Sequence, residues 1–243
     1  QGKRLATGRD FGEDGTLKKT ENVVLDEKQA SAIMASLEGG EVKVSSLEEK
    51  GFTDRAPAPF TTSTLQQESN RKFRWTARRT MQVAQRLYET GWITYMRTDS
   101  TNLSKQAVEA ARGLIRSQYG DQFLPDSPRV QKKKSKGAQE AHEAIRPSGS
   151  EFKTIKKATA ELGSDEARLY ELIWKRTVAS QMKDAKGRSL SLLLTLREAI
   201  FQAKGRVIDF PGYRRAYVEG TDDPDQELAN MDRVLPPIEK GEL

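Results

Sequence analysis

A tyrosine and an arginine stand two residues apart in the segment GWITYMRTDS, residues 91–100. If the backbone there is extended, the side chains of Tyr95 and Arg97 point the same way. A guanidinium near a phenol favours the phenolate and lowers the phenol pKa. Such a pair suits attack on a phosphodiester, because the arginine can also neutralise the non-bridging oxygens. The same spacing is typical of a core tyrosine with a hydrogen-bonded hydroxyl and of a salt bridge between Arg97 and Asp99.

The single histidine, His142, lies in the segment AQEAHEAIRPS, residues 138–148. An imidazole titrates near neutral pH, so it can donate to a phosphate oxygen or relay a proton. Glu140 and Glu143 flank it and Arg146 follows, which indicates a charged site. The alternative is a surface histidine or one whose hydrogen bonds are satisfied by its neighbours.

A third candidate region is RKFRWTARR, residues 71–79, in which five cations interleave with two aromatic rings. Cations attract a phosphate backbone, and rings can stack on bases. The alternative is a solvated, arginine-rich start of a helix. The lysine run at residues 132–136 adds non-specific attraction for nucleic acid. The candidate DNA-binding cations of this region are Arg71, Lys72, Arg74, Arg78 and Arg79.

Composition excludes several classes of function. The 243 residues include 41 Lys and Arg against 35 Asp and Glu, a net charge of +6, and 31% of all residues are charged. With a mean hydropathy of −0.74, much of the chain must face water. Its longest aliphatic stretch, Leu190–Leu196, is far shorter than the roughly 20 residues that span a bilayer. No secretory signal is visible, so we expect a cytoplasmic protein.

No metal site is expected within this chain. It has no cysteine, which excludes disulfides, thiolate metal sites and cysteine catalysis, and one histidine cannot build a His-rich centre. The acidic residues Asp222, Asp223 and Asp225 surround Pro224, a pattern typical of a surface turn rather than a metal cluster.

Charge and periodicity divide the chain into three segments. Residues 57–182 hold 22 Lys and Arg against 13 Asp and Glu, a net charge of +9, so the flanks together carry −3. The basic middle has helical periodicity, and the flanks have mainly strand periodicity. We therefore predict an α+β fold. A mainly helical domain, residues 57–182, is inserted into a discontinuous β-rich domain formed by residues 1–56 and 183–243.

The flanks predict one helix and several strands. Asp26 is the candidate N-cap of a helix that ends at Gly39 and Gly40, and an alternating strand starts near Val42. Further strands are expected at residues 190–196, 200–203, 206–210 and 213–218. Because neither flank has enough strands for a closed sheet, the two flanks should pair with each other.

The middle segment predicts at least four helices. Their expected starts or apolar stripes are a cap at Thr62 or Ser63, a stripe over Ala77, Met81, Ala84 and Leu87 stopped by Gly91, a cap at Ser104, and a cap at Ser164. The apolar stripes are typical of core packing rather than of ligand contact.

Four segments, taken in order, resemble the central part of bacterial topoisomerase I, in the type IA DNA topoisomerase family. They are PFTTSTLQQE at 59–68, GWITYMRTDS at 91–100, QEAHEAIRPS at 139–148 and LYELIWKR at 169–176. The resemblance covers almost the whole chain. It implies the helical domain that carries the family's tyrosine and the β domain that acts as a hinge when the strand gate opens.

The resemblance also implies residue roles. Tyr95 matches the tyrosine that attacks one DNA strand, becomes linked to the 5′-phosphate and leaves a 3′-hydroxyl. Arg97 matches the arginine that contacts the scissile phosphate, and His142 matches a histidine of the active-site cleft that helps to hold DNA. Arg146, in the same motif, joins the candidate DNA-binding residues, but neither it nor Glu143 is assigned a catalytic step.

In this family a separate, preceding metal-binding domain completes the site with an acidic cluster for Mg²⁺ and a lysine. That domain is a partner that this sequence lacks, and the sequence opens with Gln1 rather than Met. The expected substrate is DNA, single-stranded at the cleavage site, in the nucleoid. Covalent capture conserves the bond energy, so no nucleotide is needed, and no glycine-rich phosphate loop is present. We expect this piece alone to bind DNA weakly and not to relax supercoils.

Two other functions remain open from the residues. One is a tyrosine recombinase or phosphodiesterase, which would attach to the 3′-phosphate without a metal. The other is a non-catalytic nucleic-acid-binding module in which Tyr95 is structural.

Overall fold

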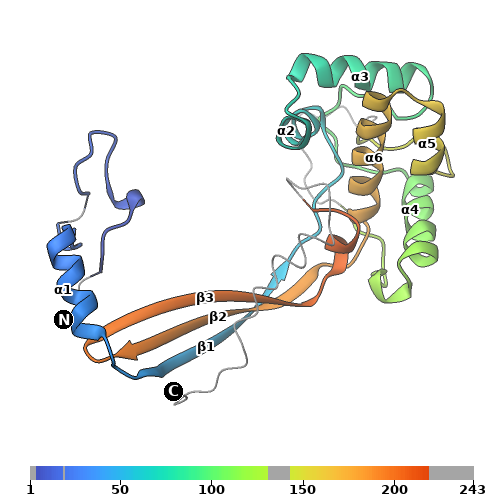
Figure 1. Ribbon diagram of the computed structural model, residues 1–243. Helices are drawn as coiled ribbons and strands as arrows, with labels where there is room; N and C mark the ends of the chain where they lie inside the picture. The colour runs from blue at the N-terminus through green and yellow to red at the C-terminus, as the bar shows by residue number, and fades with distance from the viewer. Residues whose placement is uncertain (1–3, 19, 131–142, 219–243) are drawn as a thin grey trace. The chain divides into compact units, whose positions relative to one another are not determined.

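The protein is seen in a computed structural model that describes residues 4–18, 20–130 and 143–218. Helices and strands are mixed, as the predicted α+β class requires. In chain order, the elements shown in Figure 1 are α1 (Glu27–Leu37), β1 (Val42–Asp54), α2 (Thr62–Phe73), α3 (Ala77–Glu89), α4 (Lys105–Gln118), α5 (Ile155–Glu161), α6 (Ser164–Ala179), β2 (Ala185–Leu196) and β3 (Ala199–Phe210).

The chain divides into two compact units. Among the described residues, we call them the α1 unit, with residues up to 50 and 189–205, and the helical unit, with residues 51–188 and 206–218. These divisions differ from the predicted boundaries at 56/57 and 182/183, because the first residues of β2 and the end of β1 group with the helices. Whether the predicted three segments act as functional domains remains a prediction.

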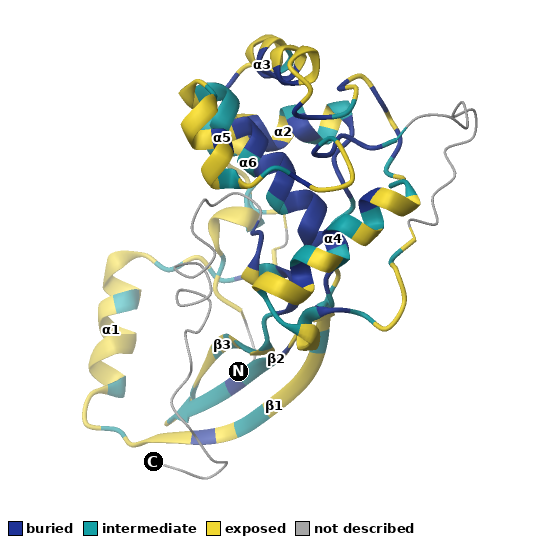
Figure 2. Cartoon of the chain, turned by 90° about the vertical axis from the view of Figure 1, so that its right-hand side faces the viewer, coloured by how far each residue is buried: buried dark blue, intermediate teal, exposed yellow. Residues whose placement is uncertain are grey.

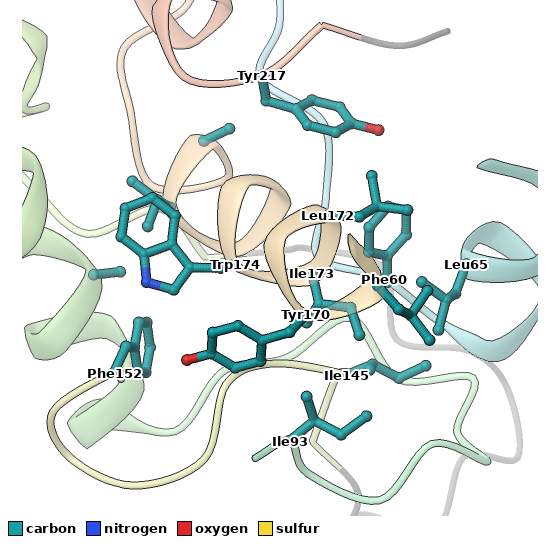
Figure 3. Packing of buried hydrophobic residues seen from close by; sticks show 14 of the residues in the cluster. Phe60, Leu65, Ile93, Ile145, Phe152, Tyr170, Leu172, Ile173, Trp174 and Tyr217 are labelled. Carbon is teal, nitrogen blue, oxygen red and sulfur yellow. The ribbon is translucent and has the colours of Figure 1, made fainter. Parts of the chain in front are cut away.

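Helix α6 is the centre of the helical unit. It packs against α3, α4 and α5, and Figure 2 shows its buried residues surrounded by the half-exposed outer helices. Apolar side chains cover most of its circumference, as expected of a helix enclosed on several sides. Figure 3 shows the resulting core, in which Tyr170, Ile173 and Trp174 of α6 lie among Phe60, Ile93 and Ile145 from three loop segments.

The predicted helices of the middle segment are present, with shifted caps. The side chain of Thr61, rather than Thr62 or Ser63, accepts a hydrogen bond from the Thr64 amide at the start of α2. Helix α6 starts at Ser164 after Gly163, which has no side chain to cap it. Ser104 caps α4 as predicted. The short helix α5, capped by Thr154, had no distinctive apolar stripe in the sequence.

The three strands form one antiparallel sheet in the order β1-β2-β3. The predicted pairing of the two flanks is therefore confirmed, because β1 comes from the N-terminal flank and β2 and β3 from the C-terminal flank. The two strands expected at 200–203 and 206–210 are one strand, β3. Gly187 of β2 leaves room for its neighbours, since a Cβ there would lie 2.2 Å from the Val207 carbonyl oxygen.

The strand predicted at 213–218 is wrong. Residues Gly212–Arg215 form a 3₁₀ turn instead. Gly212 has a φ of +51°, and a Cβ there would lie 2.4 Å from the Asp184 carbonyl oxygen, so only glycine fits this turn. The turn places Tyr213 and Tyr217 in the core of the helical unit. Alternating apolar residues alone could not distinguish this from a strand.

The α1 unit contains the predicted first helix. The Asp26 carboxylate accepts from the Gln29 amide at 2.7 Å, and Gly39 has a positive φ just after the helix. Arg197, in the turn between β2 and β3, donates to the backbone carbonyls of Ser36 and Glu38. These hydrogen bonds satisfy carbonyl groups at the end of α1, which have no partners within the helix. Among the described residues, no helix combines the length and apolar character needed to cross a membrane.

Candidate active site

The segment that carries Tyr95 alternates between exposed and buried side chains. Tyr95, Arg97 and Asp99 are exposed, whereas Met96 and Thr98 between them are buried. This is the alternation expected of an extended backbone, and the side chains of Tyr95 and Arg97 are both exposed. The buried residues hold the segment in the core while the chemically useful side chains stand outside it.

One side of this segment is bonded to the residues after His142. The Thr94 amide donates to the Arg146 carbonyl at 2.9 Å. The Thr94 hydroxyl donates to the Ala144 carbonyl at 2.8 Å and accepts from the Arg146 amide at 3.0 Å. The residue before Tyr95 is therefore tied to a chain 52 positions away.

The other side of the segment is bonded to the start of α2. The Thr62 amide donates to the Thr98 carbonyl at 2.9 Å, and the Thr62 hydroxyl donates to the Met96 carbonyl at 2.8 Å. The Thr98 amide donates in turn to that hydroxyl at 2.9 Å. Hydrogen bonds thus fix the backbone on both sides of Tyr95, at Thr94 and at Met96. They hold the Tyr95 side chain in one orientation although it lies in a loop.

A third anchor is aromatic. Trp92 is buried and meets Tyr170 of α6 edge to face, with ring centroids 5.1 Å apart. The Tyr170 hydroxyl donates to the Lys153 carbonyl at 2.7 Å, and the Lys153 ammonium lies 4.2 Å from the Trp92 ring centroid. Burial raises the pKa of Tyr170. Tyr170 therefore has the environment that one alternative interpretation assigned to Tyr95, a core tyrosine with its hydroxyl bonded.

Tyr95 itself is 43% exposed. Within the described part of the chain its hydroxyl has no hydrogen-bond partner, and its ring contacts the ring of Tyr88 edge on, at 5.3 Å between centroids. Arg97 forms no ion pair with Asp99 or with any other described residue. Among the described residues, neither the buried, hydrogen-bonded Tyr95 nor the Arg97–Asp99 salt bridge of the alternative interpretation is observed.

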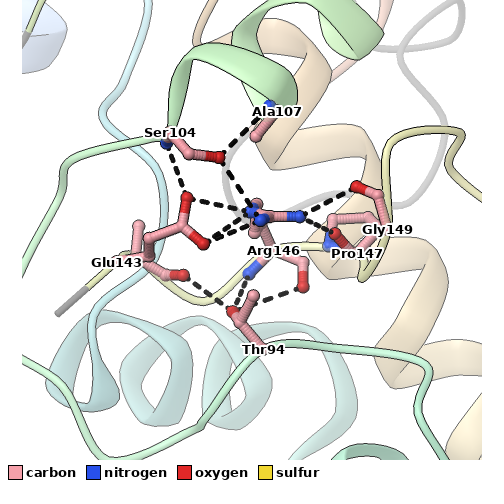
Figure 4. Close-up of polar contacts among 8 residues, drawn as sticks. Thr94, Ser104, Ala107, Glu143, Arg146, Pro147 and Gly149 are labelled. Atoms are coloured by element: carbon pink, nitrogen blue, oxygen red, sulfur yellow. Dashed lines mark hydrogen bonds and ion pairs between the residues drawn. The ribbon is translucent and has the colours of Figure 1, made fainter.

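Arg146 has the opposite environment, as Figure 4 shows. Its side chain is 8% exposed and forms an ion pair with Glu143 at 2.7 Å. The remaining guanidinium hydrogens go to the carbonyls of Pro147 and Gly149 and to the hydroxyl of Ser104. Burial alone would raise the pKa of Glu143, but hydrogen bonds from Arg146 and Ser104 outweigh it and hold that pKa below its usual value.

An open depression of about 400 Å³ lies beside Arg97. Its lining includes Ser63 and Gln66 from the first two turns of α2, with Asp99 as the carboxylate on its rim. An arginine without a partner next to a helix N-terminus attracts anions, since both carry positive charge. Tyr95 and Arg97 are therefore both exposed on this segment, and Arg97 lines the depression.

Comparisons with known proteins agree with this geometry. Residues 4–243 match a family model described as DNA topoisomerase. The chain belongs to the DNA topoisomerase family. It is 51% identical to DNA topoisomerase 1 of Mycobacterium leprae and 54% identical to that of Synechocystis sp., with 100% and 99% of the chain aligned. The resemblance to bacterial topoisomerase I that the motifs predicted is confirmed.

A solved structure supports the fold as well. Full-length topoisomerase I from Thermotoga maritima superimposes with a TM-score of 0.71 at 32% identity, over 92% of this chain and 35% of that one. The alignments to the Mycobacterium leprae and Synechocystis proteins cover 26% and 27% of those proteins. The chain therefore spans about a quarter of the length of the curated topoisomerases that it matches.

The five cations at residues 71–79 differ in availability. Arg74 and Arg78 are exposed, and neither has a partner among the described residues. Arg71 is paired with Glu68 at 3.1 Å and Arg79 with Asp165 at 2.8 Å, although both arginines remain half exposed. Lys72 lies 5.6 Å from the ring centroid of Tyr217. In this topoisomerase-family chain, Arg74 and Arg78 are thus the cations of this region that are exposed and have no described partner.

Two expectations for this region need correction. Trp75 is 3% exposed, so its ring is not open to stack on a base, and the partly buried ring of Phe73 packs against it at 4.9 Å between centroids. Arg146 was a candidate DNA contact, but its guanidinium is occupied inside the protein. Both errors have one cause, because residue type indicates what a side chain can bind but not whether the fold has already bound it.

The described residues do not form a metal site. Among the described residues, no three carboxylate or imidazole side chains lie close enough together to hold a metal. Glu143 is occupied by Arg146 and Ser104, and Glu89 accepts from Gln85 at 2.7 Å. No step of the chemistry is therefore assigned to a metal held by this chain.

Some predicted residues lie outside the described part, namely His142, the lysines at 132–136 and the acidic residues at 222–225. In contrast, sequence reasoning missed Thr94, and it named Thr62 only as a helix cap and not as a contact of the Tyr95 segment. Both lie in or beside the quoted motifs, and each provides a hydroxyl that fixes the Tyr95 segment. The sequence did contain a signal for these contacts. A threonine hydroxyl next to a candidate nucleophile, or in the first turn of a helix, can form hydrogen bonds with nearby backbone groups.

Proposed function

We propose that this chain is the central part of a type IA DNA topoisomerase, an enzyme that cleaves and rejoins one DNA strand to relax negative supercoils without ATP. The observation that carries the proposal is the exposure of Tyr95 and Arg97 on one side of an anchored segment, each without a described partner. A surface tyrosine with a fixed backbone and a free arginine beside it is positioned for a phosphodiester rather than for packing.

In the proposed reaction the Tyr95 hydroxyl oxygen bonds to phosphorus while the bond from phosphorus to the 3′ oxygen breaks. The phenol loses its proton, and the departing 3′ oxygen gains one. The product is a 5′-phosphotyrosine and a free 3′-hydroxyl, and reversal restores the strand. Because the covalent bond conserves the energy of the broken one, religation needs no nucleotide.

Arg97 is the proposed contact for the scissile phosphate, since its fork of donors matches non-bridging oxygens. His142 is the second proposed contact. The residues that follow it support this role, because Ala144 is bonded to Thr94, next to Tyr95. Whether the imidazole holds a phosphate or relays a proton is decided by the pH dependence of cleavage in a His142→Gln variant.

The proposed path of the DNA uses the exposed cations of α2 and α3. Arg74 and Arg78 are the first candidates because they lack described partners, and Arg71, Lys72 and Arg79 would contribute long-range attraction. Arg146 is left out of this path. The substrate strand is single-stranded where Tyr95 acts, and the site of action is the nucleoid in the cytoplasm.

Mg²⁺ and a separate metal-binding domain complete this proposal. The metal would be held by that domain, since the residues described here do not form a metal site. A hinge role for the sheet is supported by its strands, each of which has residues in both compact units. Opening at such a sheet would let a second strand pass while Tyr95 keeps the cleaved end.

The test exchanges the matching region of Mycobacterium tuberculosis DNA topoisomerase 1, 52% identical over 250 residues, for this chain. The chimera should relax supercoiled DNA with Mg²⁺ and, after denaturation, retain a 3′-end label and release a 5′-end label, because the 5′-phosphate that Tyr95 captures belongs to the fragment that runs to the 3′ end. Tyr95→Phe should abolish both, whereas Tyr88→Phe, which alters the neighbouring ring, should leave the covalent adduct intact.

The outcomes separate the alternatives. Retention of a 5′-end label would indicate a recombinase-like enzyme attached to the 3′-phosphate, and cleavage by the Tyr95→Phe chimera would leave only a binding module. The 243-residue chain alone should bind DNA weakly without relaxing it. Relaxation by that chain with Mg²⁺, lost in Tyr95→Phe, would contradict the proposed need for a further domain.

A further inference from the structure

A second cavity lies in the helical unit, apart from the depression beside Arg97. It has a volume of about 560 Å³ and is bounded by α4, by residues 101–103 and by residues 128–130. Its apolar wall is formed by Leu103, Val108, Pro128 and Val130. None of its lining residues belongs to the depression at Arg97. A cavity of this size with an apolar wall can hold one flat organic group.

The polar part of the lining is mainly cationic. The lining includes three cations, Lys105, Arg112 and Arg129, and one carboxylate, Glu109. Two guanidinium nitrogens, Arg112 Nη1 and Arg129 Nε, are buried without a hydrogen-bond partner. An unsatisfied buried donor is unfavourable, and a charged one more so. A ligand with anionic oxygens would supply the acceptors that the described residues do not.

Arg129 is held firmly in this wall. Its amide donates to the Gln181 side-chain oxygen at 3.2 Å, and the Gln181 side-chain nitrogen donates to the Arg129 carbonyl at 3.1 Å. Its Nη2 pairs with Asp184 at 2.5 Å. Because these contacts fix both the backbone and the far end of the side chain, little ordering is needed when an anion binds Nε.

The cavity is also continuous in sequence with the proposed active site. Residues 97–103 run from the Arg97 depression to the cavity, a distance of at most about 20 Å along an extended chain. The Asn102 carbonyl accepts from the Ala144 amide at 2.8 Å, which ties the cavity wall to the chain that anchors Tyr95. A strand of a few nucleotides can reach both places.

We infer that this cavity binds one nucleotide of the single-stranded DNA substrate. Its base lies on the apolar wall at Val108 and Pro128, and its phosphate accepts from Arg112 and Arg129. The inference rests on the proposed function and adds a second contact for the strand beyond Arg97. Such a contact would hold the strand in the helical unit independently of the covalent bond to Tyr95.

The test measures binding of end-labelled (dT)₁₂ to the 243-residue chain by fluorescence anisotropy at low salt. Arg112→Gln should weaken binding about fivefold to tenfold, the effect of losing one charged hydrogen bond. The matched control is Arg116→Gln, which removes the same charge from the same helix, at an arginine paired with Asp121 on the surface. That control should stay within about twofold.

A second variant tests the base. Val108→Trp fills the cavity and should weaken (dT)₁₂ but leave an abasic strand of equal length unaffected. Circular dichroism checks that each variant folds. If Arg112→Gln fails to fold, Lys105→Gln replaces it, because that exposed side chain has no described ion pair.

Three results would overturn the inference. Equal losses in Arg112→Gln and Arg116→Gln would show only general attraction, and unchanged (dT)₁₂ binding in Val108→Trp would exclude the cavity. Competition by free dTMP with no effect of Arg112→Gln on (dT)₁₂ would indicate a free-nucleotide site. These results are separable from the proposed function. If the chimera forms the Tyr95 adduct but Arg112→Gln binds (dT)₁₂ as tightly as the wild type, only this inference is overturned.

Discussion

The two motif segments of the site use their arginines in opposite ways. In residues 92–100, Arg97 is exposed and has no described partner. In residues 143–149, Arg146 is buried and bonded to Glu143, Ser104 and two carbonyls. The Arg97 guanidinium is exposed, whereas Arg146 stabilises the chain segment that is hydrogen-bonded to Thr94, next to Tyr95. Closeness to a candidate nucleophile in a motif therefore does not indicate a direct contact with DNA.

The largest expected effect is a difference in the free energy of unfolding between variants of Arg146 and Arg97. Arg146→Ala should lower the free energy of unfolding by about 3 kcal/mol, because it leaves Glu143 without its buried partner. Arg97→Ala should change it by less than about 0.5 kcal/mol. Urea unfolding of both variants measures the difference, and equal losses would show that Arg97 is also part of the frame.

The next effect concerns the bond between the segments. Thr94→Val should lower the free energy of unfolding by about 1–3 kcal/mol, because the Arg146 amide loses its hydroxyl acceptor. It should also slow cleavage by the chimera, since Tyr95 follows directly. Thr94→Ser retains the hydroxyl and is the control, so a Ser variant as impaired as the Val variant would point to the methyl group instead.

A smaller effect distinguishes the two tyrosines. Tyr170→Phe should lower the free energy of unfolding by about 1 kcal/mol, because its hydroxyl donates to the Lys153 carbonyl in the core. Tyr95→Phe should leave stability unchanged and abolish the DNA adduct in the chimera. Thermal unfolding and adduct assays on the same two variants should give opposite patterns.

The smallest effect is a pH dependence in the buried frame. The folded state holds the pKa of Glu143 below its usual value of 4.5, so the carboxylate contributes stability that is present above that pH. The contribution is lost as the pH falls through the folded-state pKa. The stability difference between the wild type and Glu143→Gln should therefore shrink on acidification below about 4.5, as measured by urea unfolding at several pH values, and a constant difference would contradict the prediction.

Much of the fold was predictable because its signals are local. The cap at Asp26, the stop at Gly91 and the cap at Ser104 each depend on neighbours within one or two turns. The strand expected at 213–218 failed because the turn at Gly212 depends on the carbonyl of Asp184, a contact 28 positions away. The short helix α5 was not predicted, because its seven residues are too few to show a clear apolar period.

The sequence by itself indicated that Tyr95 and Arg97 share one side of an extended segment, since a two-residue spacing is a local property, but it left open whether that side faces the core or solvent. It also determined the family, through four motifs in one order. Only the tertiary structure decided which arginine is free. The partners of Arg146 include Ser104, 42 positions away, and the Tyr95 segment is fixed by Thr62 and by the chain after His142. Contacts of that separation depend on how the helices pack, and packing determines which polar groups are satisfied before DNA arrives.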